Sequence, residues 1–323
     1  MIWIWTAFLL FIVAMLALDL GVLNRKAHVV SFREAIGWTV MWVTLALLFN
    51  VLVYFMYQHH WLGIGAAVGQ ELSGGDAALK FFTGYIIEKS LSMDNIFVIA
   101  MIFSYFHVPA QYQHRVLFWG ILGALIMRLV MILAGVALIH HFGWIIYVFG
   151  GILILTAIKM LFSSHEKIDP QRNPLIRLAR RLFPMTDDYR GASFIVRESG
   201  RTMITPLMLV LLTIESTDLL FAVDSVPAIF AVTTDPFLVF SSNVFAILGL
   251  RSLYFALAAV IGRFRYLKHS LVILLGYVGV KMLLVHHVKI DTWISLCVIA
   301  GILGGGILAS IIAARRSADK PRG

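Results

Sequence analysis

Long apolar stretches run through almost the whole chain and constrain its fold more than any other feature. A helix needs about 20 apolar residues to cross the hydrocarbon core of a bilayer. Only 13% of the 323 residues are charged, roughly half the share typical of a soluble domain. We therefore expect an all-α polytopic membrane protein of about nine transmembrane helices. The expected spans are 2–23, 37–57, 79–106, 115–139, 142–162, 204–231, 237–261, 269–287 and 291–314.

Composition also excludes several classes of protein. The apolar content rules out a soluble enzyme, and the single cysteine, Cys297, rules out an intrachain disulfide or a metal site with several cysteine ligands. A net charge of +9 could indicate a nucleic-acid partner. The basic residues lie between the apolar stretches, however, so we expect no nucleic acid.

Lysine and arginine are divided unequally between the connecting segments. If the N-terminus faces out, most of them fall on the cytoplasmic side, whereas Lys80 and Lys289 fall on the outer side. Positive charge gathers in the cytoplasmic loops of membrane proteins. We therefore predict the N-terminus out and the C-terminus in, with the basic segments facing anionic membrane lipids. The basic 163–203 loop is expected to be a linker with an amphipathic stretch at 175–183.

Three short motifs recur in the same order along the chain, which indicates an internal repeat. They are Glu88-Lys-Ser-Leu-Ser-Met-Asp94 with Asp218-Leu-Leu-Phe-Ala-Val-Asp224, Ile121-Leu-Gly123 with Ile247-Leu-Gly249, and Ile158-Lys-Met-Leu161 with Val280-Lys-Met-Leu283. The expected topology gives the two copies opposite orientations, a recurrent architecture of secondary transporters.

The repeat predicts the organisation of the whole chain. Two transmembrane helices in 1–78 precede the first three-helix unit in 79–162. The basic cytoplasmic loop of 163–203 leads to the inverted second unit in 204–287. A last transmembrane helix and a cytoplasmic tail occupy 288–323.

Acidic residues inside the expected spans are the candidates for function. They are Asp19, Glu88, Asp94, Glu215, Asp218 and Asp224. A carboxylate at the centre of a bilayer costs about 2.5–3.5 kcal/mol on insertion scales. Each therefore needs water, a cation, a basic side chain or another carboxylate nearby, so we favour a functional ion pathway.

Helical periodicity predicts which acids share a face. One stripe carries Glu88, Ser92 and Asn95, another carries Glu215, Asp218 and Ser225, and Asp94 and Asp224 fall on neighbouring stripes. Pro227 has no amide proton, so we expect a freed carbonyl oxygen at Val223 beside Asp224. The auxiliary ligands would be Asn95, Ser92, Ser225 and Asp19, although Asp19 could instead cap the membrane interface.

These groups offer oxygen ligands only. Such a set suits a hard divalent cation such as manganese, calcium or magnesium. Some carboxylates could instead carry protons as the counter-ion. The metal would be a substrate, and no prosthetic group is expected.

Ion pairing is the alternative explanation for the same acids. Glu88, Asp94, Asp218 and Asp224 could pair with Lys89, Arg128 and Arg251, which also lie inside the expected spans. Arg128 and Arg251 are read equally well as counter-charges or as gating residues.

At the acidic motifs a family resemblance becomes specific. Glu88-Lys-Ser-Leu-Ser-Met-Asp94-Asn95 and Glu215-Ser-Thr-Asp218-Leu-Leu-Phe-Ala-Val-Asp224-Ser225-Val-Pro227 resemble the paired signatures of the TerC family of bacterial integral membrane proteins. The segments 18–25 and 246–251 resemble it too, and the similarity is closest to the Alx-type branch, within the lysine-exporter superfamily. The resemblance implies a bacterial cytoplasmic (inner) membrane location. It also implies that Glu88, Asp94, Glu215, Asp218 and Asp224 form a cation site.

The family is associated with tellurium resistance by name and with manganese export by proposed function. We therefore expect a secondary transporter that exports a divalent metal cation, with manganese(II) as the cargo. The alternative is an accessory or scaffold protein for metal-stress (tellurite) resistance or for metallation of exported proteins. Its partner would be the secretion machinery or a second copy of the chain. We expect no enzyme, because two separated aspartates, Asp94 and Asp224, are a weak signal for an intramembrane protease.

Overall fold

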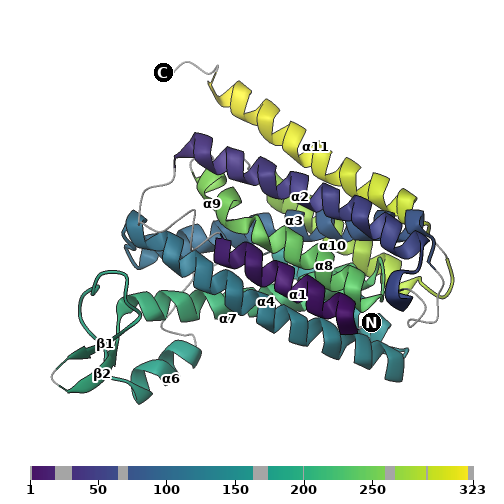
Figure 1. Ribbon diagram of the computed structural model, residues 1–323. Coiled ribbons are helices and arrows are strands. Elements are labelled where there is room, and N and C mark those ends of the chain that lie inside the picture. The colour runs from purple at the N-terminus through teal and green to yellow at the C-terminus, as the bar shows by residue number, and fades with distance from the viewer. Residues whose placement is uncertain are drawn as a thin grey trace.

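The computed structural model describes residues 2–18, 31–64, 72–162, 174–198, 200–258, 266–288 and 290–318. It is a bundle of long helices lying side by side, with a small β-hairpin at one end (Figure 1). The helices are α1 (Ile2–Leu18), α2 (Phe32–Gln58), the 3-10 turn η2 (Trp61–Gly63), α3 (Gly74–Tyr105), α4 (Ala110–His141), α5 (Ile145–Phe162), α6 (Pro174–Leu182), α7 (Pro206–Phe230), α8 (Pro236–Leu248), α9 (Leu250–Ala258), α10 (Leu267–Leu283) and α11 (Thr292–Ala318). The strands are β1 (Ile195–Glu198) and β2 (Arg201–Ile204).

Six helical stretches among the described residues are long and apolar enough to cross a membrane. They are α2, α4, α5, α7, the stretch Pro236–Leu257 that contains α8 and α9, and most of α11. Helix α1 is apolar but shorter, and α10 has 17 residues. Helix α3 has 32 residues and contains several charged side chains. The predicted all-α membrane class is confirmed, whereas the total of nine spans stays a prediction.

Polar residues fix where the helices begin. Ser31 and Glu34 form a reciprocal capping box at the start of α2, which satisfies backbone amides that have no partner inside the helix. Ser73 caps α3 by accepting from the amide of Asp76 at 3.1 Å. The buried Asp235 caps α8 by accepting from the amides of Phe237 and Leu238. These caps set the register in which each helix presents its polar side chains.

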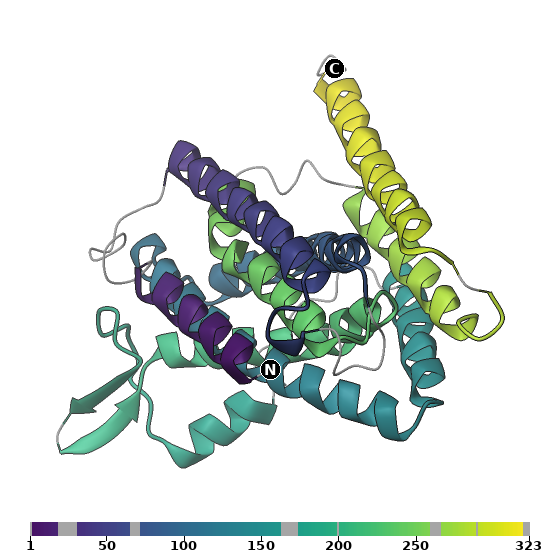
Figure 2. The same ribbon diagram turned by 45° about the vertical axis from the view of Figure 1, so that its right-hand side comes forward.

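Helix α8 forms the centre of the bundle. All of its residues from Phe237 to Leu248 are buried, and it packs against α2, α3 and α4. Figure 2 shows it enclosed by its neighbours. Two apolar clusters fill the interior. Along α3 and α7, one cluster gives way to the other near Glu88 and Asp218, so these acids lie deep inside the bundle.

Two glycines allow α5 and α10 to approach closely. A Cβ atom on Gly150 would lie 3.0 Å from the carbonyl oxygen of Gly279, and one on Gly279 would lie 2.9 Å from that of Gly150. Small residues at such crossings let the backbones of membrane helices touch. This pair of helices therefore packs backbone to backbone.

The 163–203 segment is more than the expected linker. Its described part contains the amphipathic α6, which confirms the stretch predicted at 175–183, and the strand β1, which pairs with β2 in an antiparallel hairpin. Ile176 of α6 packs with Ile204 of β2 and Leu209 of α7. The sequence analysis missed the hairpin, because its short strands are mixed with charged residues.

Pro227 does not break the sixth span, and the freed carbonyl oxygen expected at Val223 stays a prediction. Helix α7 runs unbroken from Pro206 to Phe230 with Pro227 inside it, since a membrane helix tolerates the loss of one hydrogen bond when its neighbours compensate. The interruption falls instead at Gly249, between α8 and α9. There the ammonium group of Lys89 donates to the carbonyl oxygen of Ala246 at 3.3 Å.

Candidate functional site

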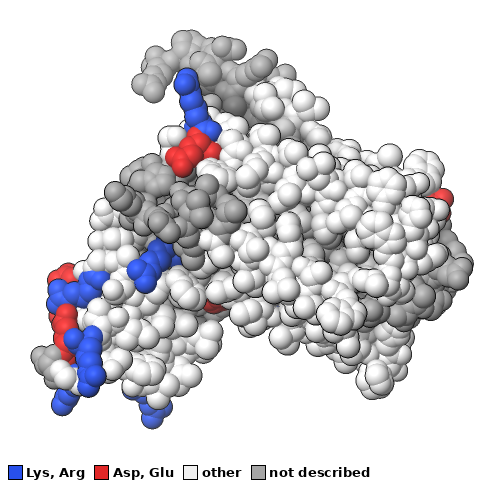
Figure 3. Space-filling model, in the orientation of Figure 1, with Lys and Arg blue, Asp and Glu red and all other residues white. Residues whose placement is uncertain are grey.

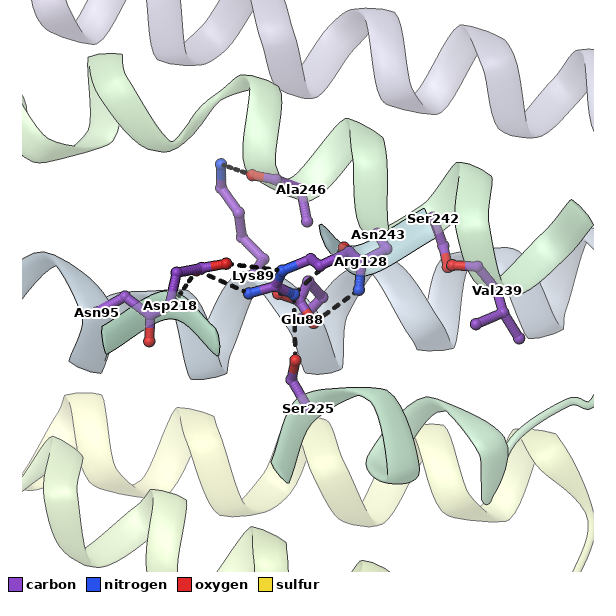
Figure 4. A network of polar contacts seen from close by, with 10 residues as sticks. All are labelled: Glu88, Lys89, Asn95, Arg128, Asp218, Ser225, Val239, Ser242, Asn243 and Ala246. Carbon is purple, nitrogen blue, oxygen red and sulfur yellow. Dashed lines mark hydrogen bonds and ion pairs between the residues drawn. The ribbon is translucent and has the colours of Figure 1, made fainter. Parts of the chain in front are cut away.

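Arg128 of α4 is the centre of the polar network inside the bundle. Its side chain is 1% exposed and lies among residues of α3, α7 and α8 (Figure 4). One terminal nitrogen, Nη1, pairs with Glu88 and also donates to Ser225 Oγ at 3.1 Å and to Asn243 Oδ1 at 3.2 Å. The guanidinium group therefore links α4 to three other helices, α3, α7 and α8.

Asp218 of α7 binds the other edge of the guanidinium group. Arg128 Nη2 donates to Asp218 Oδ1 at 3.1 Å, and Nε donates to Oδ2 at 3.4 Å. This two-pronged geometry is the strong, directional form of an arginine–carboxylate pair. The Asp218 side chain is 13% exposed, so it is more accessible than its partners.

Glu88 of α3 is the most deeply buried acid, with no exposed surface. Besides the ion pair with Arg128, its Oε2 atom accepts from Asn243 Nδ2 at 3.2 Å. Asn243 thus donates to the carboxylate with its nitrogen and accepts from the guanidinium with its oxygen. The amide of Asn95 lies near the hydrogen-bonding limit, 3.5 Å from Asp218 Oδ1.

Glu215 lies one turn before Asp218 on α7. Its carboxylate packs against the backbone of Gly123 on α4, where any Cβ atom would collide with it. Beside Asp218 there is a cavity of about 20 Å³, lined mainly by apolar side chains together with Asn95, Thr217 and Asp218. That volume holds about one water molecule. Several of its apolar lining residues belong to the cluster that reaches the hairpin end of the bundle, so the cavity lies on that side of Asp218.

The remaining predicted acids lie elsewhere. Asp224 accepts from Thr156 Oγ1 of α5 at 2.8 Å, on a different face of α7 from Asp218. Asp94 is half-buried on α3. Asp19 lies outside the described residues. Among the described residues, no three His, Cys, Asp or Glu side chains are grouped as a ready metal cluster.

Of the predicted auxiliary ligands, some lie at the Arg128 network and others do not. Ser225 contacts Arg128, whereas the hydroxyl of Ser92 is 1% exposed and has no hydrogen-bond partner among the described residues. Arg251 of α9 is 8% exposed and lines a separate small cavity with Glu34, His114 and Ser252. In this structure Glu88 and Asp218 are therefore ion-paired with Arg128, as the ion-pairing alternative expects. A role of the acids as metal ligands stays a prediction.

Asn243 and Thr156 are hydrogen-bond partners of the candidate residues that the sequence did not reveal. The polar run Ser241-Ser242-Asn243, in an otherwise apolar span, was the available signal for Asn243. Nothing in the sequence singled out Thr156, because a lone threonine in a membrane helix usually bonds its own backbone.

Comparisons with known proteins agree on one family. The profile described as the integral membrane protein TerC family matches residues 73–318. A Myxococcus xanthus protein named "Uncharacterized membrane protein STKORF319" is 51% identical over 323 residues, covering 99% of this chain and 96% of its own. The Escherichia coli (strain K12) protein named "Putative membrane-bound redox modulator Alx" is 46% identical over 301 residues, covering 93% of this chain and 91% of its own. No solved structure matches.

Proposed function

The chain belongs to the integral membrane protein TerC family, in its Alx-type branch, and from this premise we propose that it is a secondary transporter of a divalent metal cation. The ion would bind at the carboxylates of Glu88 and Asp218 and leave the cytoplasm of a bacterium across its inner membrane. Manganese(II) is the proposed cargo: hard oxygen ligands suit manganese, calcium or magnesium, and the resemblance to the TerC family favours manganese among them.

The excess of buried carboxylates over positive charge is the observation that carries this proposal. Arg128 faces both Glu88 and Asp218, and Glu215 lies one turn before Asp218 on α7. No described basic side chain contacts Glu215. When all three acids are ionised, one guanidinium cannot balance them, and unbalanced charge inside a membrane is costly. A doubly charged cation would bring more positive charge to these acids than the single guanidinium group does.

Access to the acids supports a route from the hairpin end. The cavity beside Asp218 lies on that side, whereas Glu88 has no exposed surface. Asp218 and Glu215 would receive the ion first, and Glu88 would complete the site. The unpartnered hydroxyl of Ser92 adds a further oxygen one turn along α3 from Glu88.

Charge at the surface supports the cytoplasmic assignment of the hairpin end. Lys and Arg gather over the hairpin and α6, whereas a broad band of the same face carries almost no charge (Figure 3). The C-terminus lies toward this end, and the N-terminus lies at the opposite end (Figure 1). Positive charge favours the cytoplasmic side, so the proposed orientation is N-terminus out and C-terminus in.

Helix packing supports the proposed inverted repeat of 79–162 and 204–287. Helix α3 packs against α8 and α7 packs against α4, which are the same contact in the two units. Helix α5 packs against its counterpart α10. Rocking of one unit against the other would expose the acids to each side in turn.

The name of the Escherichia coli relative, a redox modulator, raises a different activity. Dithiol exchange within this chain is excluded, because Cys297 is its only cysteine. An accessory or scaffold role remains the second candidate, and the folded arm of α6, β1 and β2 favours it as a docking surface. Replacing the arm with a short linker separates the two, because a transporter would keep its activity in liposomes.

Transport in proteoliposomes tests the proposal. Vesicles containing purified protein and a manganese-quenched dye are exposed to manganese(II), with a proton gradient or a membrane potential imposed in parallel samples. We expect wild-type protein to carry the ion, and Asp218→Asn or Glu88→Gln to lower the rate at least about tenfold, a loss of about 1.4 kcal/mol. Glu198→Gln on the exposed hairpin is the matched control. Equal rates in all four proteins, or none in wild type, would refute the proposal.

A further inference from the structure

The guanidinium group of Arg128 is surrounded by a shell of oxygen atoms. It donates to Glu88 Oε1, both carboxylate oxygens of Asp218, Ser225 Oγ and Asn243 Oδ1. These atoms come from α3, α7 and α8, whereas Arg128 itself is on α4. Figure 4 shows the four partners on different sides of the guanidinium.

The composition of this shell is that of a hard-cation site. Two carboxylates, an amide oxygen and a hydroxyl are the ligands that calcium and similar ions take from proteins, six to eight oxygens at a time for calcium. The five N–H donors of a buried arginine need acceptors, and here two carboxylates, a hydroxyl and an amide oxygen from three other helices supply them. A guanidinium group and a divalent cation would compete for the same atoms.

The guanidinium group of Arg128 keeps its positive charge when an ion approaches, because the pKa of arginine is too high for deprotonation in proteins. Two positive charges a few ångströms apart inside a membrane would repel strongly. The guanidinium and the ion therefore exclude one another, and Arg128 has to move for the ion to bind both Glu88 and Asp218. Since the oxygens and the arginine lie on different helices, this movement shifts the side chain, or α4 itself, relative to α3, α7 and α8.

We infer that Arg128 is a tethered cation that occupies the Glu88–Asp218 site in this conformation and is displaced by the transported ion. The inference rests on the proposed function and adds its regulation. Arg128 holds the acids together between transport events, so the empty carrier does not carry two unpaired buried carboxylates. Returning to the site, it would help to expel the ion.

Metal binding by the purified protein tests this inference. Manganese(II) affinity and the midpoint of thermal unfolding are measured in nanodiscs for wild type, Arg128→Lys and Arg128→Gln, with Arg251→Gln as the matched control in another membrane helix. Removing the competitor should tighten manganese binding at least about tenfold in Arg128→Gln. Arg128→Lys, with a weaker single-point contact, should fall between. Arg251→Gln should bind as wild type does.

The unfolding midpoint gives an independent readout. Arg128→Gln should unfold at a lower temperature than wild type without metal, and manganese should raise its midpoint more than that of wild type. If Arg128→Gln folds only with manganese present, that dependence supports the inference. If it folds in neither condition, Arg128→Lys decides, and binding no tighter than wild type overturns the inference.

The outcomes also separate the two proposals. Wild-type transport of manganese together with unchanged or weaker binding in both Arg128 variants refutes the tethered cation and leaves the transporter standing. No transport by wild type and no manganese binding by any variant refutes both.

Discussion

Arg128 and Arg251 follow the same tripeptide, Ile-Leu-Gly, yet they lie in different surroundings. Helix α4 continues unbroken past Gly123 and carries Arg128 into the centre of the bundle, where it meets Glu88 and Asp218. The helix after Gly249 is interrupted, and Arg251 at the start of α9 lines a cavity with the half-buried Glu34. Arg128 lies five residues after Gly123 and Arg251 two residues after Gly249, so the two arginines occupy different helical positions and only Arg128 lies between Glu88 and Asp218.

This asymmetry gives the molecule a charge imbalance at its centre. Each acidic helix contributes a carboxylate, Glu88 from α3 and Asp218 from α7, but a single arginine serves both. Had Arg251 joined them, Glu88 and Asp218 would each have an arginine of their own. In the proposed transporter, the lack of a second arginine at this point is what would leave the acids in need of a cation.

The largest expected effect comes from removing the two arginines separately. Arg128→Ala leaves two buried carboxylates without their cation, which costs about 3–5 kcal/mol when a buried pair is broken. Arg251→Ala should cost about 1 kcal/mol, because water can reach the half-exposed Glu34 beside it. Unfolding of the purified proteins in increasing denaturing detergent, without added metal, measures both. Similar losses of stability in the two variants would show that the two arginines do not differ in their contribution to the fold.

A second comparison sets Asp218 against Asp224, six residues further along α7. Asp218→Asn loses a two-pronged ion pair with Arg128, whereas Asp224→Asn weakens one hydrogen bond from Thr156. We expect Asp218→Asn to destabilise the protein by about 3 kcal/mol and Asp224→Asn by about 1.5 kcal/mol. Thr156→Val is the control for the weaker contact and should match Asp224→Asn. A larger loss of stability in Asp224→Asn than in Asp218→Asn would contradict the account, because the main stabilising contacts of α7 would then be made by Asp224 and not by Asp218.

A third comparison sets the two glycines against each other. A methyl group on Gly123 would collide with the carboxylate of Glu215, whereas one on Gly249 would meet Trp42 and the flexible end of Lys89. We expect Gly123→Ala to cost about 2 kcal/mol as overpacking and to slow manganese transport. Gly249→Ala should cost less than about 1 kcal/mol, because the Lys89 chain can move aside. Thermal unfolding and vesicle transport check both, and equal transport in Gly123→Ala and wild type would argue against a role for Glu215.

The smallest loss of stability is expected at an exposed arginine–glutamate ion pair on the hairpin arm. Arg190 Nε contacts Glu198 Oε1 at 2.7 Å, but the two side chains are 48% and 41% exposed. Surface ion pairs contribute about 0–1 kcal/mol and weaken with salt. Arg190→Gln should therefore change stability by less than about 1 kcal/mol in low salt and less again in high salt. A loss comparable to that of Arg128→Ala would show that burial is not what distinguishes the two pairs.

Sequence reasoning reached the membrane class and part of the site because both depend on local patterns. Apolar length marks membrane helices, and charged residues inside them stand out against it. The helical repeat placed Glu88 with Asn95 and Asp218 with Ser225, and the structure puts all four at the central network. The amphipathic pattern of α6 was equally readable.

The remainder depends on contacts between helices, which no local pattern encodes. Which of the basic residues meets the acids was left open, because Lys89, Arg128 and Arg251 all lie on spans. No local pattern predicts the interruption at Gly249, where Lys89 from another helix donates to the carbonyl oxygen of Ala246. Asn243 acquires its role only because α8 is surrounded on all sides.

A structure of the protein with manganese(II), in which the metal is located by its anomalous scattering, tests the central claim most directly. The account predicts the ion bound by the carboxylates of Glu88 and Asp218, with the Arg128 guanidinium moved away from them. An ion bound at another site while Arg128 keeps both of its ion pairs would contradict the account.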